Sequence, residues 1–148
     1  MRVLCVCLGN TCRSPMMERM LCHQLSDIIG YSDVSVESAG LMESAAGQAM
    51  AEFSQSELRE RGIDADGHMS RFIGALDLSD YQLILTVGEE EANAICAMRE
   101  GHAPIIVLGG GVPNPWQQGE QAYRDCANHI EQSLSGITDL LDKLRKGK

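Results

Sequence analysis

The sequence predicts an α/β fold: a single domain over residues 1–148, in which a central four-stranded parallel sheet lies between two layers of helices. Short apolar segments typical of buried strands alternate with segments of helical periodicity along the whole chain. This alternation is the pattern of a parallel sheet with helices on both faces. The chain has 148 residues, 44% of them apolar, which is enough for one hydrophobic core.

The N-terminal half contains the first two predicted strands. Residues 3–6 form a short apolar run, which Gly9 and Asn10 interrupt. Ser14 and Pro15 favour the start of a helix, which continues with apolar residues at helical spacing: Met16, Met17, Met20, Leu21 and Leu25. Residues 34–38 alternate as in a strand, and residues 45–61 predict a helix that ends at Gly62.

The C-terminal half contains the other two predicted strands. Residues 83–87 predict a buried strand, and residues 89–98 predict a helix with three glutamates at its favourable end. Residues 105–108 predict the fourth strand, which a loop over residues 109–116 follows. Residues 123–146 predict one long final helix whose basic tail suits a helix C-terminus.

The composition excludes several classes of partner. A net charge of −9 disfavours binding to nucleic acid and to anionic membranes. The sequence has no apolar run of roughly 18 residues and no signal peptide, so we expect a cytoplasmic protein without a membrane span. Its six cysteines are interpreted mostly as free thiols. We expect no metal and no cofactor, because there is no CxxC pair and the histidines lack ligand spacing.

The stretch CLGNTCRSP, residues 7–15, is the strongest candidate for a site. It links a strand to a helix, so its backbone N–H groups and the helix dipole favour an anion. Arg13 adds a planar fork for a phosphoryl group. These groups favour the thiolate of Cys7, a nucleophile for phosphoryl transfer, and Ser14 lies within reach of that sulfur. The alternative from spacing alone is a buried strand cysteine beside a surface arginine.

The longer string VCLGNTCRSPMME closely resembles the signature loop of the low-molecular-weight protein tyrosine phosphatases. Four further motifs along the chain are similar to those of the family: Ser38-Ala39-Gly40, the His-x-x-Arg of His68 to Arg71, the Tyr-x-Leu-Ile-Leu of residues 81–85, and Pro113-Asn114-Pro115-Trp116 in place of Pro-Asp-Pro-aromatic.

The resemblance implies roles for individual residues. Cys7 attacks phosphorus and forms a cysteinyl-phosphate, while Arg13 holds the phosphoryl oxygens and Ser14 eases breakdown of the intermediate. Asn10, Ser38 and His68 fix the shape of the loop. The phosphate-binding backbone comprises Leu8, Gly9, Asn10, Thr11, Cys12, Arg13 and Ser14. The implied partners are a phosphorylated protein and a phosphate or other oxyanion in the loop, and no metal is needed.

Asn114 stands where the family has its general acid, an aspartate. An amide donates a hydrogen bond but cannot deliver a proton, and such an acid is typically worth about 10²–10⁴-fold in rate. Three explanations compete: an introduced substitution, natural divergence to a slow phosphatase or phosphate-binding protein, or another carboxylate such as Glu43, Glu120 or Asp125. We favour natural divergence.

The substrate class is less well determined. Trp116 can stack on a phosphoaryl ring, and the segment after Gly40 lacks an aromatic residue, so we expect one wall of the pocket to be open. Thr11 resembles the protein-arginine phosphatase branch, whereas Asn114 lacks the charge with which that branch engages a guanidinium. We therefore rank phosphotyrosine first and phosphoarginine second.

Two further functions stay open. Related arsenate reductases share the fold and relay electrons through additional cysteines. Cys96 lies in the general region of that relay, but burial in a helix explains it better. A non-enzymatic phosphate or phosphopeptide sensor is the other alternative.

Cys12, on the same loop as Cys7, either forms a reversible protective disulfide with it or packs beneath the loop.

Overall fold

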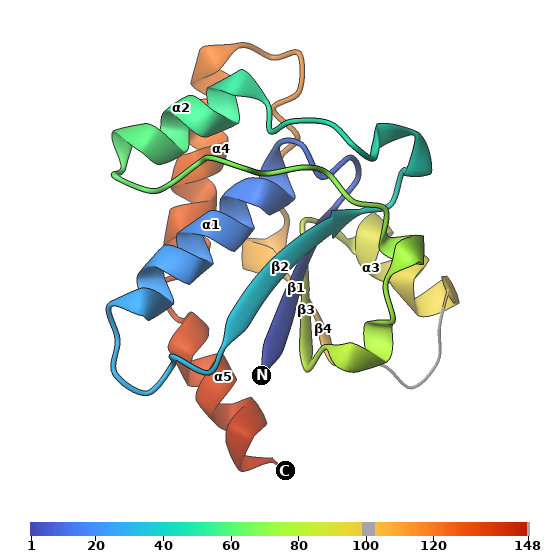
Figure 1. Ribbon diagram of the computed structural model, residues 1–148, viewed down its shortest axis with the longest axis vertical. Coiled ribbons are helices and arrows are strands. Elements are labelled where there is room, and N and C mark those ends of the chain that lie inside the picture. The colour runs from blue at the N-terminus through green and yellow to red at the C-terminus, as the bar shows by residue number, and fades with distance from the viewer. Residues whose placement is uncertain (99–102, 148) are drawn as a thin grey trace.

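The computed structural model describes residues 1–98 and 103–147 and has the predicted α/β architecture (Figure 1). Within these residues the sheet has the strand order β2-β1-β3-β4. Its strands are β1 (Arg2–Cys7), β2 (Ser35–Gly40), β3 (Leu83–Thr86) and β4 (Ile105–Val107), and all pairs are parallel. The prediction of a four-stranded parallel sheet is therefore confirmed. Cys7 ends a central strand and is paired in register with Gly40, the end of β2.

Helices cover both faces of the sheet, as predicted. Alternate residues of β1 point to opposite sides, so Val3, Cys5 and Cys7 belong to one hydrophobic cluster and Leu4 and Val6 to the other. The first cluster also contains side chains of α1 (Arg13–Ser26), α2 (Glu52–Glu60), α4 (Glu120–Ser133) and α5 (Ile137–Lys146). The second includes Ile95 of α3 (Glu89–Met98). Cys7 thus faces the layer that contains α1.

The helix predicted over residues 45–61 is wrong in its first part. A short 3₁₀ turn, Glu43–Ala45, ends there, and α2 begins only at Glu52. The intervening backbone is extended and pairs with a distant segment, because Ser70 N donates to Gln48 O at 2.8 Å and Ala49 bridges Met69 antiparallel. Gly47, at a φ of 84°, also leaves the helical region. A non-local pairing therefore overrides the local helical pattern.

The single helix predicted over residues 123–146 is also wrong. The structure has two helices: α4 starts at Glu120 and ends at Ser133, and α5 starts at Ile137. Gly136 precedes α5 with a φ of −103° and a ψ of 13°, outside the helical range. The break lets each helix direct its own apolar side to the core: Ile130 from α4 and Leu141 from α5 are both fully buried.

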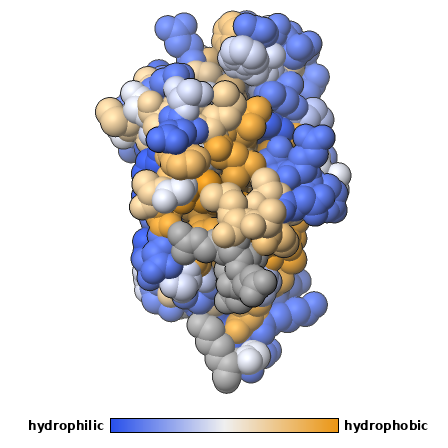
Figure 2. Space-filling model, turned by 90° about the vertical axis from the view of Figure 1, so that its right-hand side faces the viewer, coloured by the Kyte–Doolittle hydropathy of each residue, from blue (hydrophilic) through white to orange (hydrophobic). Residues whose placement is uncertain are grey.

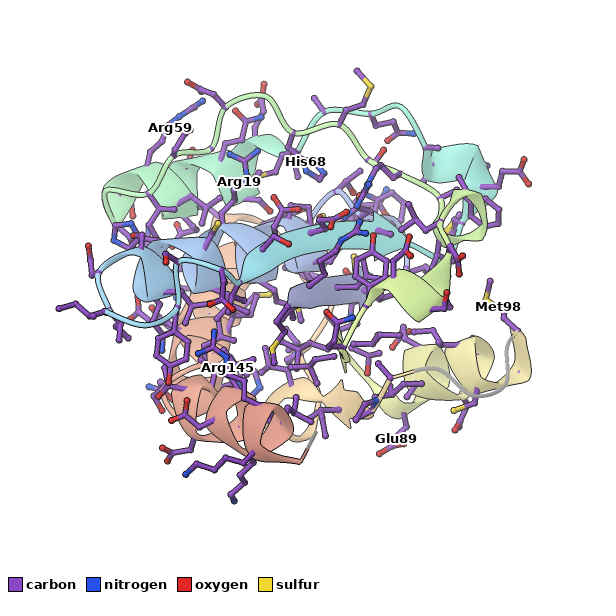
Figure 3. The ribbon with its side chains drawn as sticks, turned by 60° about the horizontal axis from the view of Figure 1, so that its bottom comes forward. Arg19, Arg59, His68, Glu89, Met98 and Arg145 are labelled. Atoms are coloured by element: carbon purple, nitrogen blue, oxygen red, sulfur yellow. The ribbon has the colours of Figure 1, made fainter. Side chains whose placement is uncertain are left out.

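On the face that carries α3, apolar side chains gather near the middle, and hydrophilic ones lie to either side of them (Figure 2). Arg145 of α5, labelled in Figure 3, donates to Gly30 O at 2.8 Å and lies 4.9 Å above the Tyr31 ring, which holds α5 against the turn after α1. In the part of the chain that the structure describes, no helix is both long and apolar enough to cross a membrane.

Candidate active site

The loop between β1 and α1 is held by the segment that follows β2. Leu8 O accepts hydrogen bonds from Leu41 N at 2.8 Å and from Met42 N at 3.0 Å. A Cβ atom on Gly40 would lie 2.9 Å from both Leu8 O and the carbonyl carbon of Gly9, which is closer than real Cβ contacts allow. Only a glycine at position 40 therefore lets the loop cross over the end of β2.

The Cys7 thiol lies at the centre of the loop with hydrogen-bond donors around it. Its Sγ is 3.0 Å from Ser14 Oγ, and Asn10 N donates to it at 3.2 Å. Asn10 Nδ2 donates to Ser14 Oγ at 2.7 Å. Because this bond occupies the hydroxyl as an acceptor, its single proton is available for the Cys7 sulfur. Both donors thus point at the sulfur of a residue that is only 2% exposed.

Asn10 holds the loop in an otherwise unfavourable conformation. Its φ is 58°, in the left-handed region that asparagine tolerates better than most residues, and its side chain is fully buried. Asn10 Oδ1 accepts from Arg71 N at 2.9 Å, and Asn10 O lies 2.8 Å from His68 Nε2. Since a carbonyl oxygen only accepts, His68 carries a proton on Nε2. His68 comes from the segment after α2 (Figure 3).

The hydroxyl of Ser38 is not bonded to the loop whose shape the sequence predicts that Ser38 fixes. It donates to Glu18 Oε1 at 2.7 Å and not to any of residues 8–14. Its carbonyl accepts from Arg71 Nε at 3.2 Å and from Nη2 at 3.1 Å. Arg71 also pairs with Glu37 at 3.2 Å. Partial burial raises the pKa of Glu37, but hydrogen bonds from Tyr81, Arg2 and Arg71 outweigh it and lower that pKa below its usual value.

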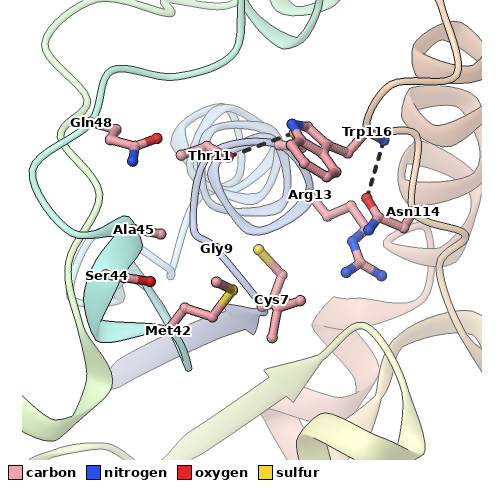
Figure 4. A pocket seen from close by; sticks show the side chains of 12 residues that line it. Cys7, Gly9, Thr11, Arg13, Met42, Ser44, Ala45, Gln48, Asn114 and Trp116 are labelled. Carbon is pink, nitrogen blue, oxygen red and sulfur yellow. Dashed lines mark hydrogen bonds between the residues drawn. The ribbon is translucent and has the colours of Figure 1, made fainter.

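Arg13 is the first residue of α1 and turns inward. It is 8% exposed, and its Nη1 donates to Val112 O at 2.9 Å. The guanidinium lies beside the cavity into which the Cys7 sulfur points (Figure 4). The donors that Val112 does not use can bind an oxyanion there. Arg13 thus links the loop after β1 to the loop before α4.

Cys12 contacts α4. Its Sγ lies 3.2 Å from Tyr123 Oη and 3.7 Å from Thr11 Oγ1. Burial, followed by the hydrogen bond to Cys12, raises the pKa of Tyr123, so its hydroxyl stays neutral and can donate. Burial also raises the pKa of Cys126 to about 12, although Arg13 opposes the shift. All six cysteines are free thiols in this structure.

A cavity of about 270 Å³ opens above the Cys7 sulfur. Its floor is formed by Cys7, Leu8, Gly9, Thr11, Cys12 and Arg13. The segment after Gly40, from which the sequence predicts one wall, contributes Met42, Ser44, Ala45 and Gln48. The sequence did not single these residues out individually, and none of them is aromatic. Asn114 and Trp116 line the opposite side.

Asn114 makes one hydrogen bond within its own exposed loop. Its Oδ1 lies 3.2 Å from Trp116 N (dashed line in Figure 4), and since a backbone N–H can only donate, the atom facing it is the oxygen. The amide nitrogen is consequently directed to the Arg13 side. Trp116 is 58% exposed.

The other carboxylates considered from the sequence lie elsewhere. Neither Glu43 nor Glu120 is among the described residues that line the cavity above Cys7. Asp125 lines a neighbouring cavity of about 500 Å³, which it shares with Asn114 but not with Cys7. Cys96 is exposed, so its predicted burial in a helix is wrong. It belongs to α3, whose buried Ile95 packs on the opposite face of the sheet from Cys7.

The central strand β1 ends in a cysteine, the Asn10 N–H is directed at the sulfur of that cysteine, and a buried arginine lies beside it. Together these features define a cysteine-centred site suited to an oxyanion. The family described as low molecular weight phosphotyrosine protein phosphatase matches residues 2–147, and the chain belongs to this family of hydrolases.

Several individual proteins are similar to this chain over most of its length. The low molecular weight protein-tyrosine-phosphatase Wzb of Escherichia coli K12 is 28% identical over 137 residues, which cover 88% of each chain. The solved structure of the drosophila arginine phosphatase DARP is 27% identical, with a TM-score of 0.84 and coverage of 95% and 98%. Vibrio vulnificus Wzb, solved with benzylphosphonate, shares the fold at 23% identity and a TM-score of 0.78, covering 93% and 97%.

Proposed function

We propose that this protein hydrolyses protein phosphotyrosine through a cysteinyl-phosphate on Cys7. Membership of the phosphatase family implies a phosphorylated substrate. The observation that carries the proposal is the environment of the Cys7 sulfur. This sulfur accepts a hydrogen bond from Asn10 N at 3.2 Å and lies 3.0 Å from Ser14 Oγ, and Cys7 lines the same cavity as Arg13. This is the arrangement that a thiolate nucleophile beneath a phosphoryl group needs.

In the first step the Cys7 thiolate attacks phosphorus, an S–P bond forms and the bond to the tyrosyl oxygen breaks. The tyrosine leaves as a phenolate, which then takes a proton from solvent. Arg13 and the backbone N–H groups of residues 8–14 hold the phosphoryl oxygens, which gather negative charge in the transition state. In the second step water attacks phosphorus, the S–P bond breaks and the proton of the water passes to solvent. The Ser14 hydroxyl, 3.0 Å from the sulfur, donates a hydrogen bond to the departing Cys7 thiolate. Asn10 and His68 keep the loop in the shape that both steps require.

We further propose that Asn114 makes both steps slow. The leaving tyrosyl oxygen needs a proton, and the water needs a base, whereas an amide supplies neither. Asp125 does not line the cavity of Cys7, which supports the absence of a replacement carboxylate among the described residues. We expect the rate to depend steeply on the pKa of the leaving phenol.

The test compares the native protein with Asn114→Asp on a series of aryl phosphates and on phosphotyrosine. Native rates should fall steeply as the phenol pKa rises, and Asn114→Asp should flatten this dependence. The phosphocysteine should be detectable by mass after rapid quenching and absent from Cys7→Ser. A flat dependence in the native protein would show that a working acid exists elsewhere, and no phosphoenzyme with any aryl phosphate would refute the proposal.

Phosphoarginine is the second candidate. It is favoured by Thr11, which lines the cavity, and by the similarity to the drosophila arginine phosphatase. The described lining contains no carboxylate to pair with a guanidinium, which favours phosphotyrosine. A phosphoarginine peptide assayed beside a phosphotyrosine peptide of the same sequence decides between them, since each hypothesis expects the larger kcat/KM for its own substrate.

A further inference from the structure

The second step of the proposed reaction needs a group that orients water. In an in-line displacement the water reaches phosphorus from the side opposite the departing Cys7 sulfur, which is the mouth of the cavity. The floor of the cavity holds the phosphoryl oxygens, so the attacking position is bordered by the side walls. A water is oriented when one of its hydrogens is bonded to an acceptor, because its lone pair is then turned toward phosphorus. The walls must therefore supply a hydrogen-bond acceptor.

The described walls carry four polar side chains: Ser44, Gln48, Asn114 and Trp116. The Trp116 indole only donates, and the Asn114 oxygen faces Trp116 N at 3.2 Å, which leaves the NH₂ group, also a donor, for the cavity. The Ser44 hydroxyl can accept, but its side chain is short. The Gln48 amide has an acceptor oxygen on a longer side chain, and within the described residues the hydrogen bonds of Gln48 are those of its backbone. Gln48 is therefore the best acceptor for the water.

The backbone of Gln48 is fixed, although the residue is exposed. Gln48 N donates to Ser70 Oγ at 2.8 Å, and Gln48 O accepts from Ser70 N at 2.8 Å. From this anchored segment the side chain extends into the cavity, on the side opposite Trp116 (Figure 4). Because both backbone groups are bonded, the amide has a defined origin from which to reach a water above phosphorus, while its own donor and acceptor stay available.

We propose that Gln48 is a catalytic residue that orients the water of the second step. Gln48 Oε1 accepts a hydrogen bond from the water, and the water oxygen attacks phosphorus in line with the Cys7 sulfur. A P–O bond forms, the S–P bond breaks with its electron pair on the sulfur, and a proton of the water passes to solvent. Because an amide takes up no proton, Gln48 orients the water without activating it, so hydrolysis stays slow beside Asn114. This inference rests on the proposed function and adds a residue to its second step.

The experiment measures the two steps separately. Para-nitrophenyl phosphate, whose phenolate leaves readily, forms the phosphocysteine, and rapid quench with mass analysis follows the formation of this intermediate and its decay. Gln48→Met keeps the length of the side chain but removes both amide groups. We expect its phosphocysteine to decay about 10-fold more slowly, the worth of one hydrogen bond, and to form within about twofold of the native rate. Gln48→Glu keeps an acceptor oxygen, so its phosphocysteine should decay faster than that of Gln48→Met.

Two control variants accompany this measurement. Gln132→Met makes the same change at an exposed position on α4, outside the lining of the cavity above Cys7, and should keep native rates of both steps. Ser44→Ala removes the other acceptor of that wall and should keep the native decay rate. Urea unfolding of Gln48→Met should match the native protein, because the bonds to Ser70 come from the Gln48 backbone.

The outcomes separate this inference from the proposed function. Native decay of the phosphocysteine in Gln48→Met, or an equal slowing of its formation and its decay, would overturn the role of Gln48 and leave the proposed function in place. A phosphocysteine that forms in no variant and not in the native protein would refute the proposed function as well.

Discussion

The two loops that border the cavity are built in opposite ways. Residues 8–14 are held by buried polar contacts: Asn10 is fully buried and bonded to Arg71, His68 and Ser14, and Arg13 is 8% exposed. Residues 113–117 are anchored at their base, where Val112 N donates to Val87 O at 2.7 Å, but Asn114 and Trp116 beyond it are exposed. The phosphoryl group would thus meet a fixed cradle, and the leaving group a less constrained wall.

Because the two loops differ in this way, we expect substitutions in residues 8–14 and in residues 113–117 to have different effects. If Cys7 is the nucleophile as proposed, changes in residues 8–14 should alter every reaction that passes through it, because all of those reactions would use the same phosphoryl contacts. Changes in the exposed loop should alter how the protein ranks its substrates while leaving the fold intact. Four substitutions test this separation.

The largest effect is expected from Arg13→Lys. An ammonium group can replace the contact to Val112 O but cannot bind two phosphoryl oxygens as a planar fork. We expect kcat/KM for phenyl phosphate to fall by about 10²–10³-fold. Arg59→Lys, at an exposed position on α2, is the matched control and should keep native activity. A fall in kcat/KM of less than about threefold in Arg13→Lys would contradict a contact between Arg13 and the phosphoryl group.

Gly40→Ala should come next. The added Cβ would lie 2.9 Å from the backbone of Leu8 and Gly9, so the loop must shift. A displacement of this size near a reacting atom typically costs about 10²-fold in rate. Gly136→Ala, where an added Cβ meets nothing within 4 Å, is the control and should be fully active. Native activity in Gly40→Ala would show that the loop tolerates movement.

Trp116→Ala tests the exposed wall. We expect KM for aryl substrates to rise about 2–10-fold, the worth of one aromatic contact, with kcat nearly unchanged. The free energy of unfolding should change by less than about 0.5 kcal/mol, as is usual for an exposed position. Trp116→Phe should retain most of the binding. A large loss of stability in urea unfolding would show that the side chain is structural.

Glu37→Gln should have the smallest effect on activity and a measurable one on stability. Because the folded state lowers the pKa of Glu37, its stabilisation is complete above the pKa of the unfolded carboxyl and is lost as pH falls through the lower folded value. We expect a cost of about 1 kcal/mol at pH 7 that disappears in acid, measured by urea unfolding. Glu60→Gln is the exposed control. A pH-independent cost would contradict the linkage.

The sequence predicted the loop of residues 8–14 better than the residues along the side of the cavity, for a physical reason. Cys7 and Arg13 follow from a local pattern of strand, loop and helix, so their convergence could be predicted from the chain alone. Gln48 and Ser44 line the cavity because the backbone near Gln48 pairs with Ser70, more than twenty residues away in the chain. The helical pattern of residues 45–61 contains no sign of that pairing. The contact between Cys12 and Tyr123 likewise joins residues brought together only by folding.

The burial of Cys7 has a practical consequence for the chemical labelling of the cysteines. Cys22 and Cys96 are exposed, whereas the other four thiols are buried. We therefore expect a bulky maleimide to mark these two surface positions first and to leave Cys7 unlabelled. If the loop binds phosphate as proposed, a small anionic alkylating agent should reach Cys7 through the cavity, and inorganic phosphate should compete with that agent.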